Sequence, residues 1–306
     1  NCPGGLLVYN SKQHSYRDLP LRLGELGLVH RHEKSGELHG LFRVRNFTQD
    51  DAHLFVTPDQ VEAEIQHTID LFDEVYNTFG LTYVAELSTR PDDSMGTDED
   101  WELATNGLRK ALEHRGLDYI VNEGDGAFYG PKIDFHLKDS IGRTWQCGTI
   151  QYDMQMPEKF NLTYVGEDGE KHRPIMLHRV VYGSIERFIG ILIENYAGAF
   201  PTWLAPVQAR ILPITDKQAD YAYELRKKMF DLGLRIEVDD RSEKIGKKIR
   251  ESQMLKTPYS LVVGDQEMAD GTVAVRKYGE QQSETMKVED FIAYLQDQIA
   301  TKAKKF

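Results

Sequence analysis

The sequence predicts an α+β domain followed by a smaller α/β domain. Up to about residue 200, strand-like segments follow one another through turns with long helix-like segments inserted, which is typical of an antiparallel sheet. After Pro206, strand and helix patterns alternate, which predicts a mainly parallel sheet with crossover helices. A length of 306 residues also exceeds the usual size of one compact domain. We therefore expect domains at residues 1–205 and 206–306.

Local signals define the elements of the first domain. Thr57 to Gln60 forms a helix start, with Thr57 as N-cap, Pro58 at the first position and Gln60 placed for a capping box. The apolar residues that follow recur at the helical period until Gly80. Further helices are predicted at 98–114 and 184–197, and strands at 28–33, 41–53, 81–87, 117–121, 131–137, 143–153 and 175–182.

The second domain reads as four strands and three helices. The strands are predicted at 207–213, 233–238, 259–264 and 272–277, and the helices at 216–231, 243–255 and 288–302.

Composition excludes some classes of protein. The net charge of −12 argues against unspecific nucleic-acid binding through a global basic field. From Val207 onward, however, 18 Lys and Arg face 17 Asp and Glu, against 19 and 32 upstream, so only the C-terminal part approaches a polyanion without net repulsion. Two cysteines are too few for a disulfide framework, and no apolar run is long enough to cross a membrane. We expect a cytoplasmic protein without membrane association.

The hairpin from Val29 to Leu54 carries the densest set of polar side chains. If 41–53 is a strand, alternation places six residues on one face: Arg43, Arg45, Phe47, Gln49, Asp51 and His53. Such a row either lines a cleft or forms a solvated sheet surface. The glycine-dense loop 124–130 similarly reads either as backbone close to a ligand or as a plain loop.

Several segments resemble a known family. Arg31-His32-Glu33 before a glycine-containing loop resembles motif 2 of class II aminoacyl-tRNA synthetases, and Gly183 to Arg187 at a helix start resembles motif 3. Segments 1–4, 16–20, 47–53, 126–132 and 201–206 are similar, in this order, to threonyl-tRNA synthetases along essentially the whole chain. The resemblance implies ATP-dependent activation of L-threonine to threonyl-adenylate and transfer to tRNA(Thr), with Mg²⁺ accompanying ATP.

The resemblance also implies roles for site residues. Arg31 would hold the α-phosphate and Arg187 the γ-phosphate, and both count as catalytic. The remaining ATP-binding set would be Glu33, Arg43, Phe47, Gln146 and Thr149, with Phe47 stacking on adenine. Gln146 and Thr149 have opposite strand parity, so a bulge or twist is expected around Gly148. Threonine would be bound by Gln49, Asp51, Tyr129, Lys132 and Gln151.

Cys2, His53 and His178 would hold one zinc per chain according to the resemblance. Their spacing gives no local metal motif, and each residue alone is more often structural. Three protein ligands leave an open position, here for the amino and hydroxyl groups of threonine.

The resemblance implies that the second domain binds the anticodon, with Glu267 and Arg276 reading bases from neighbouring strand ends and with Lys244 and Arg250 nearby. Two positions depart from the family pattern: Gly5 replaces the usual histidine after Asn-Cys-Pro-Gly, and Ser242 stands where bacterial relatives often carry asparagine. Motif 1 and the N-terminal editing domains are not in the sequence, so we expect a fragment of an enzyme whose full-length form is a homodimer.

Two rival functions stay open from the sequence. A sister enzyme, such as a prolyl- or seryl-tRNA synthetase, would differ in zinc content and in its need for a substrate hydroxyl. A non-catalytic, tRNA-binding relative would be expected to lose charged site residues, whereas Arg31, Arg187 and the three candidate zinc ligands are all present.

Overall fold

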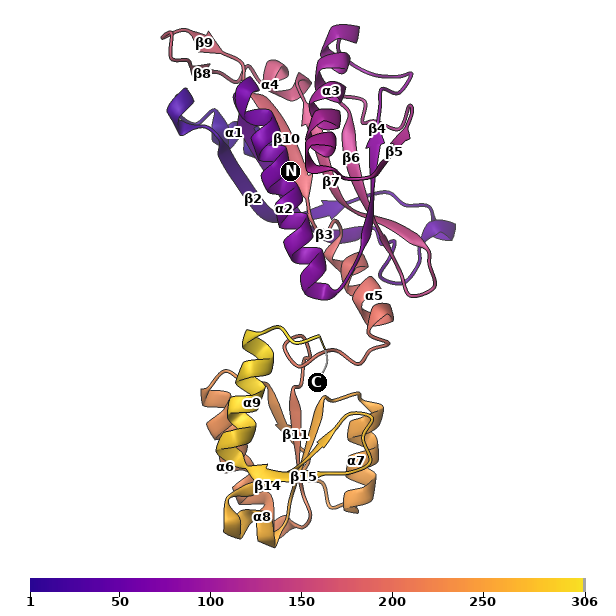
Figure 1. Cartoon of the computed structure of the whole chain (residues 1–306), viewed down its shortest axis with the longest axis vertical. Coiled ribbons are helices and arrows are strands. Elements are labelled where there is room, and N and C mark those ends of the chain that lie inside the picture. Colours follow the sequence, from indigo (N-terminus) through magenta and orange to yellow (C-terminus); the bar gives the residue numbers. More distant parts are fainter. Residues whose placement is uncertain (305–306) are drawn as a thin grey trace. The chain divides into compact units, whose positions relative to one another are not determined.

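The computed structural model describes residues 1–304 and separates into two compact units, Asn1–Leu192 and a unit beginning at Ile193 (Figure 1). The first unit holds a largely antiparallel sheet with helices and the second a smaller α/β sheet, which confirms the predicted fold class. The division between the two compact units falls inside helix α5 (Ile185–Asn195), so the domain boundary near Pro206 stays a prediction. Within residues 1–304, no helix has the length and apolar character needed to span a bilayer.

The central sheet of the first unit has the strand order β2-β3-β10-β7-β6-β4-β5. In that order the strands are Leu21–His30, Asn46–Val56, Ile175–Val180, Thr144–Asp153, Lys132–Lys138, Tyr83–Ser88 and Tyr119–Asn122. Neighbours pair antiparallel except β4 and β5, which are parallel. The segment predicted at 117–121 is the edge strand β5, as expected. A small second sheet joins β1 (His14–Ser15), β8 (Tyr164–Val165) and β9 (Lys171–His172).

Helices α2 (Val61–Phe79) and α3 (Asp98–Arg115) cover one face of this sheet (Figure 1). The predicted capping box precedes α2 in the turn η3 (Pro58–Gln60), where the Thr57 N–H donates to Gln60 Oε1 at 3.1 Å. The helix ends at Gly80 with φ 71°, again as predicted. On β6, Phe135 is fully buried and packs against Phe72 of α2. Its neighbours along the strand, Asp134 and His136, therefore face the other side of the sheet.

The strand predicted at 41–53 is displaced along the chain. β3 begins at Asn46, because residues 39–43 form a tight turn in which Phe42 N–H donates to the His39 carbonyl at 2.9 Å. Arg43 and Arg45 therefore do not belong to the alternating row, which keeps Phe47, Gln49, Asp51 and His53. The partner strand is β2, which ends at His30 rather than running through 28–33.

Several short elements have no counterpart among the predictions. These are the three strands of the small sheet, β1, β8 and β9, together with α1 (Cys2–Tyr9), α4 (Gln155–Lys159), α8 (Asp265–Asp270), β15 (Glu284–Lys287), and the turns η1 (Tyr16–Asp18) and η2 (Ser35–Glu37).

The second unit is built on the strand order β12-β11-β13-β14-β15, where the first four are Ile236–Val238, Ala209–Pro213, Tyr259–Val263 and Thr272–Lys277. β11 is parallel to β12 and β13, but β13, β14 and β15 are antiparallel. The sheet is therefore mixed: the predicted parallel pairing is confirmed for β12, β11 and β13 and is wrong for β14. The segment between β13 and β14 holds only the short α8, whereas a crossover between parallel strands needs a dozen residues or more.

Helices cover both faces of this second sheet (Figure 1). α6 (Ala219–Asp231), which follows the turn η4 (Asp216–Gln218), and α9 (Val288–Ala300) contribute Leu225, Met229, Phe291 and Leu295 to one buried core. α7 (Ile245–Met254) lies on the opposite face, where Ser260 of β13 donates to Ser252 at 2.8 Å.

Candidate functional site

A polar pocket of about 140 Å³ lies on the face of the first sheet turned away from α2. It brings together all seven residues of the predicted ATP set, together with two of the threonine set. The lining includes Arg31, Glu33, Arg43, Phe47, Gln49, Gln146, Thr149, Gln151 and Arg187. These come from the β2–β3 connection, β3, β7 and α5, so four separate elements build one pocket.

Three guanidinium groups converge on this pocket. Arg187 is fixed by two hydrogen bonds, from Nε to the Phe42 carbonyl at 2.9 Å and from Nη1 to the Gln146 carbonyl at 2.8 Å. Burial, together with the nearby charges of Arg43 and Arg31, lowers the pKa of Arg187. Glu33 is the one acidic residue in the lining and forms an ion pair with Arg43 at 3.7 Å. The pocket therefore carries excess positive charge and suits a polyanion such as a triphosphate.

Arg31 and Phe47 form the part of the pocket proposed for the base and the α-phosphate. The Arg31 guanidinium carbon lies 5.2 Å from the centroid of the Phe47 ring, and Phe47 is only 7% exposed. A purine that stacks on this ring would have to displace Arg31 from it.

The start of α5 positions Arg187. Gly183 has φ 70°, and a Cβ at this position would lie 2.6 Å from the Cys147 carbonyl oxygen, so only glycine fits there without a shift. Ser184 Oγ accepts from the Arg187 N–H at 3.2 Å. The Glu186 carboxylate accepts from the Thr48 N–H at 3.0 Å and ties the helix to β3.

Cys2, His53 and His178 lie together although they come from distant parts of the chain. Their ligand atoms lie within 4.8 Å of one another, and Cys2 Sγ is 3.6 Å from His178 Nδ1. A tetrahedral zinc with bonds of about 2.3 Å to sulfur and about 2.0 Å to nitrogen places those two atoms roughly 3.5 Å apart. His53 Nε2 is buried and has no hydrogen-bond partner among residues 1–304. The three side chains therefore fit a zinc ion.

His178 is oriented by a buried carboxylate. Asp153 Oδ2 lies 2.8 Å from His178 Nε2, which leaves Nδ1 directed toward Cys2. Burial opposes the charged imidazole, but the bonds to Asp153 and Cys2 raise the pKa of His178 to about 9. A Cβ at Gly5 would lie 3.4 Å from His53 Nδ1, so position 5 borders this cluster.

The other proposed threonine residues lie between this cluster and the pocket. Tyr129 donates to Gln151 Oε1 at 2.5 Å, and its ring lies 5.4 Å from that of His178. Asp51 Oδ2 is 3.6 Å from His53 Nε2. Lys132 forms ion pairs with Asp125 at 3.1 Å and Asp134 at 2.7 Å.

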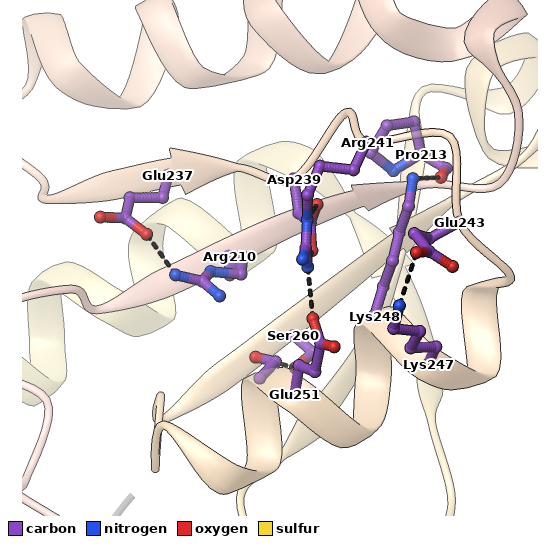
Figure 2. A network of polar contacts seen from close by, with 11 residues as sticks. Arg210, Pro213, Glu237, Asp239, Arg241, Glu243, Lys247, Lys248, Glu251 and Ser260 are labelled. Carbon is purple, nitrogen blue, oxygen red and sulfur yellow. Dashed lines mark hydrogen bonds and ion pairs between the residues drawn. The ribbon is translucent and has the colours of Figure 1, made fainter.

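In the second unit, internal contacts occupy several of the basic side chains around α7. Lys247 is paired with Glu243 at 2.5 Å, and the buried Lys248 donates to the Pro213 carbonyl at 3.0 Å (Figure 2). Figure 2 also shows Arg241 held between Asp239 and Glu251. Within residues 1–304, Lys244 and Arg250 have no side-chain hydrogen bond or ion pair and remain available to a ligand.

The placement of Glu267 and Arg276 differs from the expectation. Glu267 lies on α8, where its carboxylate accepts from the Gly264 N–H at 2.8 Å. Arg276 lies on β14 opposite Ser260, near the start of β13, and donates to the Glu280 carbonyl at 3.0 Å. The expectation of neighbouring strand ends is wrong, because β13 and β14 are antiparallel and α8 follows the far end of β13.

Sequence reasoning missed two buried carboxylates at the first site, Asp134 and Asp153. Asp153 is the last residue of β7, and no local sequence pattern marks it as a site residue. Asp134 was detectable in principle, because the alternation of β6 places it on the same face as Lys132.

Comparisons with known proteins agree with this architecture. Residues 1–196 match the family model described as tRNA synthetase class II core domain (G, H, P, S and T), and residues 208–298 match that of an anticodon binding domain. The threonine--tRNA ligases of Desulforamulus reducens and Acetivibrio thermocellus are 67% and 66% identical over 302 residues, or 99% of this chain. The chain spans about half the length of these curated relatives, 48% of each.

Solved structures give the same result. The RNA binding domain of threonyl-tRNA synthetase from Cryptosporidium parvum Iowa II has a TM-score of 0.94 and 41% identity, covering 97% of this chain and 75% of that one. A structure titled as a putative threonyl-tRNA synthetase from Aeropyrum pernix has a TM-score of 0.81 and 28% identity, covering 99% and 75%. On this evidence, the chain belongs to the threonyl-tRNA synthetase family of class II aminoacyl-tRNA synthetases.

Proposed function

We propose that the chain activates L-threonine with ATP and transfers the threonyl group to tRNA(Thr). The observation that carries this proposal is the adjacency of two sites: an arginine-rich pocket and the Cys2, His53 and His178 cluster. The two are linked along β3, where Phe47 and Gln49 line the pocket and His53 belongs to the cluster. A second link is Gln151, which lines the pocket and is the strand partner of His178.

In the first step, a threonine carboxylate oxygen attacks the α-phosphorus of ATP. A new P–O bond forms as the bond to pyrophosphate breaks, giving threonyl-adenylate and pyrophosphate. Arg31 would stabilise the charge on the α-phosphate and Arg187 would hold the γ-phosphate, with Mg²⁺ accompanying ATP. Because Arg187 is anchored by two backbone carbonyls, it needs little reorganisation when the triphosphate binds. No side chain acts as a nucleophile.

Cys2, His53 and His178 would hold one zinc, which supplies a Lewis-acid position for the amino and hydroxyl groups of threonine. Asp153 would keep His178 Nδ1 directed at the metal. Asp51 would accept from the threonine hydroxyl, and Tyr129 with Gln151 would close the pocket around the side chain. Lys132 would lie beside them.

In the second step, a ribose hydroxyl at the tRNA terminus attacks the adenylate carbonyl, and AMP leaves. The second domain, which we place from about Pro206, would bind the anticodon through Lys244, Arg250, Glu267 and Arg276. The availability of Lys244 and Arg250 supports this assignment. In the full-length enzyme we expect a homodimer.

The direct test is threonylation of a tRNA(Thr) transcript by the purified chain, with a tRNA of another specificity as the control. We expect acid-precipitable threonine on tRNA(Thr) only. If the protein exchanged pyrophosphate with ATP in the presence of proline but not of threonine, the result would instead support the activity of a sister synthetase.

A further inference from the structure

An irregularity in β7 places two side chains on the same face of the sheet. Asp134 pairs with Thr149 and Phe135 with Gly148, but the next residue, His136, pairs with Gln146, so Cys147 is an extra residue in β7. In a regular strand Gln146 and Thr149 would point to opposite faces. The bulge removes this difference, and both side chains line the pocket.

Asp134, on the neighbouring strand β6, contacts both of these side chains. Its Oδ1 accepts from Gln146 Nε2 at 2.6 Å and from Thr149 Oγ1 at 2.6 Å. Its Oδ2 lies 2.7 Å from Lys132 Nζ. Asp134 is only 1% exposed, so these three donors, and not water, satisfy the carboxylate.

The contacts fix the hydrogen-bond polarity of the pocket wall. A carboxylate only accepts, so Gln146 must turn its NH₂ group toward Asp134 and leave its Oε1 for the pocket. The Thr149 hydroxyl proton is also committed, because the second neighbour of Oγ1 is another acceptor, the Ile133 carbonyl at 3.2 Å. Both side chains therefore offer an acceptor oxygen to a ligand, and the Thr149 hydroxyl has no proton left to donate.

A metal site at Asp134 is the main alternative. Ligand atoms of Glu86, Asp134 and His136 lie within 4.8 Å of one another. However, Lys132 already neutralises Asp134, and Glu86 accepts from Asn122 at 2.7 Å. A divalent cation at Asp134 would have to displace the Lys132 ammonium and the hydrogen bonds from Gln146 and Thr149. This cluster is therefore better explained as a hydrogen-bonded network.

We infer that Asp134 is a positioning residue that orients Gln146 and Thr149 as hydrogen-bond acceptors for ATP. The groups bound by these two side chains are then hydrogen-bond donors of the nucleotide or of a hydrated Mg²⁺, and not phosphate oxygens. This inference rests on the proposed function for the identity of the ligand. Phosphate oxygens are left to the three arginines that line the same pocket.

The test is a double-mutant cycle read out as the Kd for ATP with Mg²⁺ by calorimetry on the whole chain. Asp134→Leu and Thr149→Val should each weaken ATP binding about tenfold, because Thr149→Val removes one pocket-facing acceptor and Asp134→Leu removes the carboxylate that orients it. The double variant should bind within about twofold of the weaker single variant, since Thr149 is no longer oriented once Asp134 is gone. Glu64→Leu is the matched control: it removes a buried carboxylate bonded to Arg22 outside the pocket, and should leave the Kd unchanged.

If Asp134→Leu does not fold, Asp134→Asn takes its place in the cycle, and Thr149→Ser and Thr149→Val test the hydroxyl. The serine variant keeps the hydroxyl and should bind ATP like the wild type, whereas valine should not. Three results would overturn the inference. They are equal ATP affinity of the serine and valine variants, equal ATP affinity of the Asp134 variant and the wild type, and losses of affinity that multiply in the double variant. Threonine-dependent exchange by the wild type is measured separately. If exchange is absent while ATP binding follows the predicted cycle, the proposed function fails and the role of Asp134 stands.

Discussion

The guanidinium of Arg31 covers the ring of Phe47, with its central carbon 5.2 Å from the ring centroid. The two residues proposed to bind the α-phosphate and the adenine thus contact each other in the pocket. ATP binding would exchange this cation–π contact, worth about 0.5–1 kcal/mol at an accessible site, for base stacking and a phosphate contact. Adenine stacking on Phe47 would therefore displace Arg31 from the ring.

Arg31→Ala should lower ATP–pyrophosphate exchange about 100-fold or more, because it removes one oriented charge from the transferring group. Threonine affinity should change little, since Arg31 is not assigned to the threonine side. Arg17→Ala is the matched control, because Arg17 is exposed and contacts a tyrosine ring outside the pocket. Near-normal exchange by Arg31→Ala would show that the motif 2 assignment is wrong.

Zinc content tests the Cys2, His53 and His178 cluster. Elemental analysis should find one zinc per chain in protein purified without chelators, and Cys2→Ser should lose it because a hydroxyl is a far weaker zinc ligand than a thiolate. Cys147→Ser is the control for loss of a cysteine, since Cys147 is not in the cluster. Retention of the full zinc content by Cys2→Ser would place the metal elsewhere.

Gly183→Ala should destabilise the fold through the close approach of Cys147. Gly169→Ala serves for comparison: it shares a positive φ, 81°, but a Cβ there has open space. We expect a loss of about 1 kcal/mol at Gly169 from the backbone conformation alone. At Gly183, a Cβ that would lie 2.6 Å from the Cys147 carbonyl oxygen should add roughly 1–3 kcal/mol of overpacking. Equal losses in denaturant unfolding would mean that the contact relaxes freely.

Elements with local signals were predictable and those held by packing were not. The capping box at Thr57 and the glycine at Gly80 define α2 because both signals lie within its own sequence. By contrast, α1 contains two glycines among its eight residues, and glycine is a poor helix former. It is a helix because Leu6 and Tyr9 are buried against Phe55, a contact that no local pattern encodes.

The candidate site divides in the same way. Family motifs identify Arg31 and Arg187, and the resemblance also groups Cys2 with His178, whereas no local pattern could do so because the two are 176 residues apart. A bulge was expected around Gly148 from the parity of Gln146 and Thr149, and β7 has one at Cys147. The role of Asp134 could not be predicted, because it depends on the register between two strands.

Arg276→Ala should weaken charging of tRNA(Thr), by about tenfold, while threonine activation stays nearly unchanged in the other domain. A side chain at a base edge contributes discrimination, whereas a phosphate contact contributes mainly salt-dependent affinity. Lys247→Ala should have less effect, because Lys247 is already paired with Glu243, and that effect should fade as salt rises. If Arg276→Ala reduced tRNA-independent exchange as much as charging, the division of labour between the domains would have to be abandoned.

The most direct measurement of the central claim is amino-acid-dependent ATP–pyrophosphate exchange with threonine, serine and valine on the same preparation. Serine keeps the hydroxyl and loses a methyl, a difference worth about 1–3 kcal/mol, so it should be activated detectably. Valine matches threonine in shape but leaves the polar position at the Cys2, His53 and His178 cluster unsatisfied, so its exchange should be barely measurable. Exchange that follows the order threonine, serine, valine is the predicted result, and comparable rates for valine and threonine would contradict the account.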